Sequence, residues 1–205
     1  MKSHVALLVI DVQNDFCPGG ALAVAGGDEI VPLVNRLAAG FSTVVITQDW
    51  HPAGHASFAA SYPGREPFGM IDLKYGPQVL WPTHCVMGTA GAALHADLDI
   101  PHACLILRKG SHAGVDSYSA FLEADRETKT GLDGYLASRG VTEVFVCGLA
   151  TDYCVAWSAE DARKFGFGAA VIEDACRAID LNGSLAAAWA RLAAAAVGRI
   201  QSIAL

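Results

Sequence analysis

The sequence places a thiol, a carboxylate and an ammonium group where apolar segments end. Asp11 directly follows one such segment, Lys109 closely follows another, and Cys154 lies just beyond a third. A thiol with a carboxylate as its base and a cation beside it can attack a carbonyl carbon. These residue types therefore indicate covalent catalysis with Cys154 as nucleophile, Asp11 as base and Lys109 as electrostatic partner.

Cys154 lies where a strand is expected to give way to a helix, after a turn of small residues that begins at Gly148. At a helix N-terminus, unpaired N–H groups and the helix dipole favour a thiolate and can face a developing oxyanion. On position alone, an inert buried cysteine fits equally well. Asp11 and Lys109 favour the functional interpretation, because burying either charge without a partner is costly. A structural ion pair between Asp11 and Lys109 is the remaining alternative.

A second group of polar residues has the types expected of a metal site. Asp49 and His51 can reach one cation, because residues two apart in an extended segment project to the same side. His84 can add a third ligand from a loop, and His55 is a further candidate. One carboxylate and two imidazoles leave positions open for water or substrate on Zn(II), Fe(II) or Mn(II). Histidines in a polar surface loop are the common alternative.

The segments that must position these side chains alternate between buried strands and helices. The alternation predicts an α/β fold with a doubly wound, mainly parallel six-stranded sheet and helices on both faces. Ligands of such sheets bind beyond the carboxyl ends of the strands. The expected strands cover residues 5–10, 43–47, 103–107, 143–147, 169–172 and 199–204. The expected helices cover residues 30–39, 132–139, 153–165 and 185–196.

A loop-rich insertion from about residue 50 to 95 interrupts this alternation, because it is rich in Pro, Gly, His and aromatic residues. Connections of this length within an α/β domain are usually functional. Gly and Pro are scattered along the 205 residues rather than gathered in a linker, and 53% of the residues are hydrophobic. We therefore expect residues 1–205 to form a single domain.

Charge and apolar patterning argue against several classes of partner. The net charge of -7 leaves no basic face for nucleic acid. No apolar stretch is long enough to span a bilayer, and the run before Asp11 is too short for a secretory signal. We therefore expect a cytoplasmic protein with a small-molecule substrate and no nucleic-acid or membrane partner. A homo-oligomer is compatible with the sequence.

Five motifs occur in the order typical of one enzyme family and cover nearly the whole chain. They are DVQNDFCPGGALAV from Asp11, TQDWHPAGHASF from Thr47, WPTHCVMGTAGAALH from Trp81, RKGSHAGVDSYSAF from Arg108, and GLATDYCV from Gly148. Five ordered motifs are far more specific than any one of them. The sequence thus resembles the bacterial nicotinamidases (pyrazinamidases) of the isochorismatase-like hydrolase superfamily.

The resemblance implies a catalytic triad of Asp11, Lys109 and Cys154. It also implies an oxyanion hole formed by the backbone N–H groups of Ala150 and Cys154, with a cis peptide bond between Leu149 and Ala150. The implied reaction is hydrolysis of nicotinamide to nicotinate and ammonia through a Cys154 thioester, in NAD salvage. Pyrazinamide is an expected second substrate, and no nicotinamide dinucleotide cofactor is required.

The resemblance assigns Asp49, His51 and His84 as ligands of one divalent metal ion. Zinc is the expected metal, with iron and manganese as alternatives. His55 matches a histidine that is counted as a ligand in only some relatives.

Aromatic residues are implied to hold the substrate ring. Phe16 and Trp81 match the residues that stack against the pyridine ring in similar enzymes, and Tyr118 is a further candidate wall.

Two rival functions differ from this expectation. A metal-independent amidohydrolase of N-carbamoyl or ureido compounds has the same fold and triad, but usually lacks the residues Asp49, His51 and His84. A non-catalytic metal-binding or redox-sensing protein would leave Asp11 and Lys109 without a purpose. Release of ammonia from a carboxamide separates the second rival from an enzyme.

Overall fold

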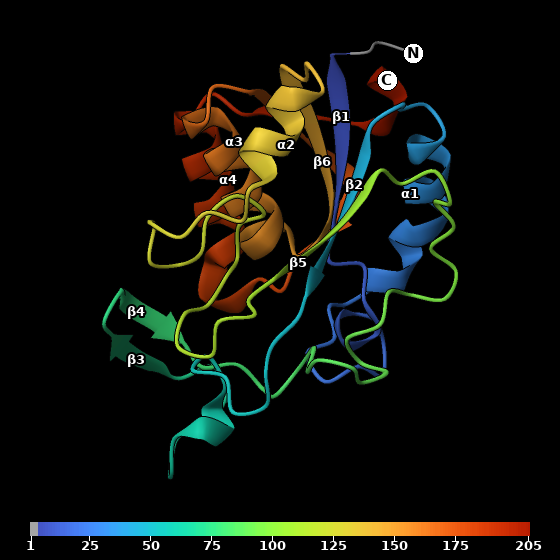
Figure 1. Cartoon of the computed structure of the whole chain (residues 1–205). Coiled ribbons are helices and arrows are strands. Elements are labelled where there is room, and N and C mark those ends of the chain that lie inside the picture. The colour runs from blue at the N-terminus through green and yellow to red at the C-terminus, as the bar shows by residue number, and fades with distance from the viewer. Residues whose placement is uncertain (1–3) are drawn as a thin grey trace.

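A six-stranded parallel sheet forms the centre of the molecule, as the sequence predicts (Figure 1). The computed structural model describes residues 4–205. The strands of this sheet are β1 (Val5–Ile10), β2 (Val44–Asp49), β5 (Leu105–Lys109), β6 (Glu143–Leu149), β7 (Gly168–Arg177) and β8 (Gly198–Ile200). Their spatial order is β5-β2-β1-β6-β7-β8, and all neighbours pair in parallel.

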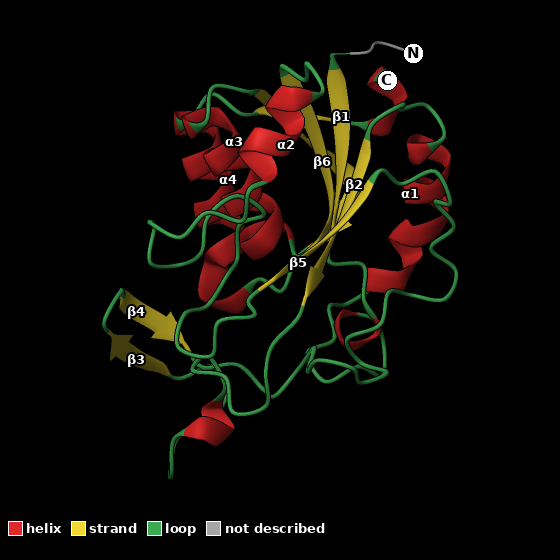
Figure 2. Ribbon diagram, viewed as in Figure 1, coloured by secondary structure: helices red, strands yellow, loops and turns green. Residues whose placement is uncertain are grey.

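Helices cover both faces of the sheet, which explains why β1 is an unbroken apolar run with all six residues buried. The helices are α1 (Val31–Ala38), α2 (Leu132–Ser138), α3 (Ala156–Lys164) and α4 (Ser184–Ala194). Figures 1 and 2 show α1 on one face and the other three helices on the opposite face. Within residues 4–205, no helix combines the length and the apolar character that crossing a bilayer requires.

Several expected elements differ in their bounds, such as β7, which continues to Arg177 rather than ending at residue 172, and two differ in kind. The last strand ends at Ile200 rather than continuing to residue 204, because residues 202–204 form a 3-10 turn. Asp174 stabilises that turn by accepting a 2.8 Å hydrogen bond from the backbone N–H of Ser202. The helix expected from residue 153 begins instead as a π-helical turn, Thr151–Val155, which precedes α3. Cys154 therefore lies in a wider turn than an ordinary first helical turn.

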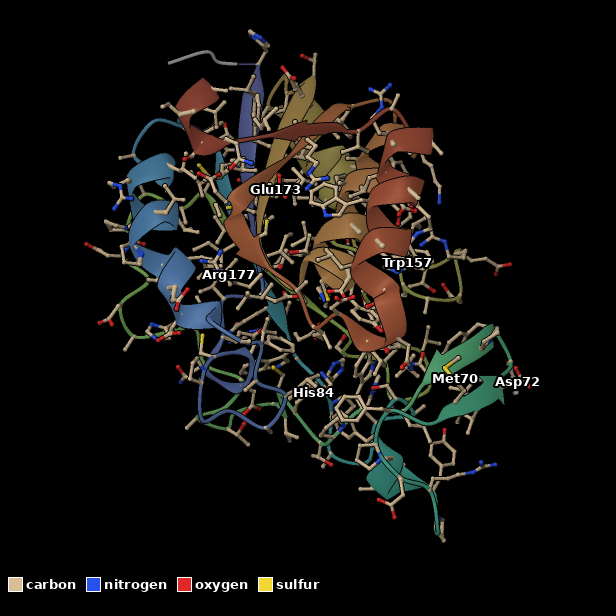
Figure 3. All side chains as sticks on the ribbon, turned by 180° about the vertical axis from the view of Figure 1, so that it is seen from behind. Met70, Asp72, His84, Trp157, Glu173 and Arg177 are labelled. Atoms are coloured by element: carbon tan, nitrogen blue, oxygen red, sulfur yellow. The ribbon has the colours of Figure 1, made fainter. Side chains whose placement is uncertain are left out.

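The insertion contains a short hairpin that the sequence pattern did not predict. Strands β3 (Met70–Leu73) and β4 (Gly76–Val79) pair in antiparallel fashion, and Gly76 has a φ of 116°. Most of these strand residues are partly or fully exposed, so they form no apolar run that would reveal them. Figure 3 shows His84 at the same end of the molecule as the hairpin, where Met70 and Asp72 are labelled.

The carboxyl ends of the central strands converge at this end of the sheet. Asp11 follows β1, and the turn that carries Cys154 follows β6. Asp49 at the end of β2 is the register partner of Lys109 at the end of β5. From β1 the chain continues to β2 and then β5 on one side of β1, and later returns to form β6, β7 and β8 on its other side. Such a reversal of strand order opens a crevice beyond the strand ends. The fold therefore brings both groups of candidate residues to one crevice.

Candidate active site

Lys109 lies at the centre of the candidate site and is buried. Its Nζ donates hydrogen bonds to the Oδ1 of Asp49 at 2.5 Å, to the carbonyl oxygen of Ser117 at 2.7 Å and to the Sγ of Cys154 at 3.4 Å. The same Nζ lies 2.9 Å from the Oδ2 of Asp11. The structure therefore brings the sulfur, the carboxylate and the ammonium group named from the sequence into one buried cluster.

The Asp11 carboxylate is fully buried, and this burial raises its pKa. The positive charge of Lys109 and the hydrogen bond from the Thr47 hydroxyl oppose that rise without cancelling it. Thr47 Oγ1 donates to Asp11 Oδ1 at 2.6 Å and accepts the backbone N–H of Asp11 at 3.1 Å. A buried carboxylate with a raised pKa is suited to taking and returning a proton.

The thiol of Cys154 is buried, and its surroundings act on its pKa in opposite directions. Burial raises its pKa well above the ordinary value, and the nearby charge of Lys109 opposes this effect. The carboxylates of Asp11 and Asp49 raise the pKa of the thiol further. A proton acceptor beside the sulfur is therefore needed before the sulfur can attack a carbonyl carbon.

The turn that carries Cys154 begins at Ala150, whose peptide bond with Leu149 is cis, as the family resemblance implied. The backbone N–H groups of Tyr153 and Val155 both donate to the carbonyl oxygen of Ala150 at 3.1 Å. Ala150 and Cys154 line the same small cavity. Their N–H groups stay the predicted oxyanion donors.

The ligand atoms of Asp49, His51 and His84 lie within 4.8 Å of one another. The Nε2 atoms of His51 and His84 are 3.5 and 3.8 Å from the Oδ2 of Asp49. Each Nδ1 faces a carbonyl oxygen, that of Gly110 at 2.9 Å and that of Pro82 at 2.8 Å. A carbonyl can only accept, so each Nδ1 carries the hydrogen and each Nε2 keeps a lone pair for a cation. This buried donor set fits a divalent metal ion.

His55 lies beside this cluster, but its two ring nitrogens are already engaged. Its Nε2 faces the carbonyl oxygens of His112 and Val115 at 3.0 and 3.1 Å, so this nitrogen donates. Its Nδ1 accepts from the Ser57 hydroxyl at 2.8 Å. A second group of close donor atoms joins His55 with His51 and Asp116. Because both nitrogens have protein partners, His55 is not counted with the three ligands above.

A small cavity lies over Cys154. Its walls include the aromatic side chains named from the sequence, Phe16, Trp81 and Tyr118. The indole Nε1 of Trp81 donates to the Tyr118 hydroxyl at 3.0 Å, and the rings of Trp81 and Tyr153 meet edge to face at 4.8 Å. The aromatic walls suit a flat ring with a short polar substituent.

Several residues of the site were not identified from sequence. The Gln13 side chain binds both backbone groups of Asp49, accepting from N at 2.8 Å and donating to O at 2.9 Å. Three more residues belong to the site. Thr47 binds Asp11, the carbonyl oxygen of Ser117 binds Lys109, and Asp116 lines the cavity. Thr47 precedes Asp49 by two residues, so the alternation of side chains along a strand could have pointed to it.

Comparisons with known proteins agree with this geometry. The protein-family model described as the isochorismatase domain matches residues 5–204 of the sequence. A nicotinamidase of Acinetobacter baylyi is 59% identical over 98% of this chain and 94% of its own length.

Solved structures are similar over the whole fold. A structure described as a nicotinamidase pyrazinamidase of Acinetobacter baumanii has a TM-score of 0.99 and 59% identity, covering 100% of this chain and 99% of the other. A pyrazinamidase of Pyrococcus horikoshii in complex with zinc has a TM-score of 0.78 and 34% identity, covering 97% of this chain and 99% of the other. The chain belongs to the isochorismatase family.

Proposed function

We propose that the protein is a nicotinamidase that hydrolyses nicotinamide to nicotinate and ammonia, accepts pyrazinamide as well, and serves NAD salvage. One observation carries this proposal beyond the similarity to relatives. The Nζ of Lys109 lies 3.4 Å from the Sγ of Cys154 and 2.9 Å from the Oδ2 of Asp11, beneath a small aromatic-walled cavity. The nucleophile thus lines the cavity where a carboxamide fits, and a fixed cation lies beside both the nucleophile and its base.

The first half of the reaction forms a thioester. Asp11 takes the proton of the Cys154 thiol, and the sulfur attacks the carboxamide carbon. The resulting oxyanion accepts hydrogen bonds from the backbone N–H groups of Ala150 and Cys154. Asp11 then returns the proton to the amide nitrogen, the C–N bond breaks, and ammonia leaves.

The second half releases nicotinate. A water molecule gives a proton to Asp11 while its oxygen adds to the thioester carbon. When the C–S bond breaks, Asp11 returns that proton to the sulfur of Cys154, and the nicotinic acid loses its own proton to solvent and leaves as nicotinate. The ammonium group of Lys109 stays protonated throughout, because the neighbouring carboxylates outweigh its burial and raise its pKa. Its positive charge stabilises each negative charge that develops on the sulfur.

Asp49, His51 and His84 hold one divalent metal ion, for which zinc is the first choice, since a relative carries zinc. When bound, the ion supplies a Lewis acid that anchors and orients the substrate. Phe16 and Trp81 hold the pyridine ring between them, and Tyr118 closes one side of the cavity.

The test is release of ammonia and nicotinate from nicotinamide by the purified protein. Cys154→Ala should abolish turnover. Cys104→Ala, at a partly exposed cysteine away from the cluster, is the matched control and should keep full activity. Undiminished turnover in Cys154→Ala would contradict the mechanism. Ammonia release from N-carbamoyl compounds but not from nicotinamide would favour the rival amidohydrolase.

A further inference from the structure

The two carboxylate oxygens of Asp11 have different surroundings, and the difference comes from one hydroxyl group on the neighbouring strand. Oδ1 accepts the 2.6 Å hydrogen bond from Thr47 Oγ1. Oδ2 is buried and accepts no hydrogen bond of good geometry within residues 4–205. A buried oxygen without a donor is unusual and calls for a functional explanation.

Oδ2 faces the ammonium group of Lys109, whose Nζ lies 2.9 Å away as a buried ion pair. An ammonium group has three hydrogens. The three acceptors of Nζ are the Oδ1 of Asp49, the carbonyl oxygen of Ser117 and the Sγ of Cys154. Nζ thus has four close neighbours for three hydrogens, so its attraction to Oδ2 of Asp11 is largely one of charge. Oδ2 is thus the oxygen that the Thr47 hydroxyl does not occupy, and a carboxylate oxygen of Asp11 lies within 4.8 Å of the Cys154 sulfur.

The Thr47 hydroxyl is itself fixed in direction. It accepts the backbone N–H of Asp11 at 3.1 Å, so its single hydrogen is directed at the Oδ1 of the same residue. Thr47 is fully buried on β2, beside the end of β1. The pair of hydrogen bonds forms a closed ring that holds both the backbone and the side chain of Asp11, whose φ is 48°.

We propose that Thr47 is a positioning residue that makes Oδ2 of Asp11 the atom that receives the Cys154 proton. By occupying Oδ1, the hydroxyl leaves a single basic oxygen and keeps it turned toward the sulfur. The S–H bond breaks as the Oδ2–H bond forms, and the same Oδ2 later gives this hydrogen to the departing nitrogen. The proposal rests on the proposed function, because it assigns a role within that reaction.

The test replaces the hydroxyl with a methyl group of similar size in Thr47→Val. Without the ring of hydrogen bonds Asp11 can rotate, so kcat should fall by about 10- to 100-fold. The KM for nicotinamide and the bound metal measured by elemental analysis should change by less than twofold. Thr47→Ser, which keeps the hydroxyl, should recover kcat to within about threefold of the wild-type value.

A matched control is Thr43→Val, four residues earlier on the chain. Thr43 is also buried, but it lies just before β2, whereas Thr47 lies near the end of β2 that carries Asp49, and its replacement should leave kcat unchanged. If Thr47→Val does not fold, Thr47→Ala also removes the hydroxyl and should show the same loss of kcat.

Three results would overturn the role of Thr47. They are wild-type kcat in the variant without the hydroxyl, a rise in KM in place of the fall in kcat, and equal losses in the serine and valine variants. A wild-type protein that releases no ammonia from nicotinamide would instead contradict the proposed function itself.

Discussion

Asp49 and Lys109 face each other across the paired strands β2 and β5, and their contact joins two groups of functional side chains. The Nζ of Lys109 binds the Oδ1 of Asp49 at 2.5 Å, whereas the Oδ2 of Asp49 faces the Nε2 atoms of His51 and His84. Burial raises the pKa of Asp49, but the positive charge of Lys109 opposes this, and the pKa lies well below the usual range. The same lysine thus keeps a metal ligand ionised and stands beside the nucleophile.

Lys109→Met should cost both activity and stability. The change leaves the carboxylates of Asp11 and Asp49 buried without their cation, so the free energy of unfolding should fall by about 3 to 5 kcal/mol. Turnover of nicotinamide should be lost as well, because the charge beside the Cys154 sulfur is gone. Denaturant unfolding and ammonia release check the two effects. Lys129→Met, at a largely exposed lysine, is the control and should change neither quantity appreciably. Unchanged stability in Lys109→Met would show that the two carboxylates do not depend on this cation.

Removal of one metal ligand should lower the metal content without unfolding the protein. His51→Ala takes away one of the three donors around Asp49, and such a loss weakens binding by at least about tenfold. Elemental analysis of the purified variant measures the effect, and a chelator should reversibly lower the activity of the wild type. His95→Ala, at a partly exposed histidine outside the cluster, should keep the full metal content. Retention of wild-type metal in His51→Ala would show that the site is misassigned.

Loss of the aromatic wall should weaken substrate binding more than it slows the reaction. Trp81→Leu removes the ring that packs edge to face against Tyr153 and donates to Tyr118. A stacked aromatic pair contributes about 0.5 to 1.5 kcal/mol, so KM should rise by about 3- to 10-fold. Steady-state kinetics with nicotinamide provide the measurement. Trp189→Leu on α4 is the matched control and should leave the KM unchanged. An unchanged KM in Trp81→Leu would show that Trp81 does not contact the substrate.

The ion pair between Glu173 and Arg199 should make a small, pH-dependent contribution to stability. Hydrogen bonds from Arg199 lower the pKa of Glu173 below its usual value of 4.5, and partial burial opposes this only in part. A lowered pKa means that the stabilisation is present above pH 4.5 and is lost as pH falls through the pKa of the folded state. Glu173→Gln should therefore have a slightly lower Tm at pH 7, and the difference should shrink toward pH 4. A constant difference across this range would contradict the assignment.

The local pattern of the sequence was enough to locate most strands and the polar residues at their ends. β1 spans Val5–Ile10 as predicted, because burial on both faces leaves an unbroken apolar run that ends where the crevice begins. The same reasoning identified Asp11, Lys109 and Cys154, since ionisable or nucleophilic side chains are conspicuous directly after such runs. The family motifs added the cis peptide bond before Ala150.

The tertiary structure decided which atoms of these residues meet. Asp11 and Thr47 are 36 residues apart, and their contact depends on how β1 and β2 align, which no local periodicity reports. The pKa of the Cys154 thiol likewise depends on burial and on charges from other strands, which an argument from the helix start alone does not include. A sequence read segment by segment specifies side-chain chemistry, whereas distances and desolvation arise only when separate strands pack together.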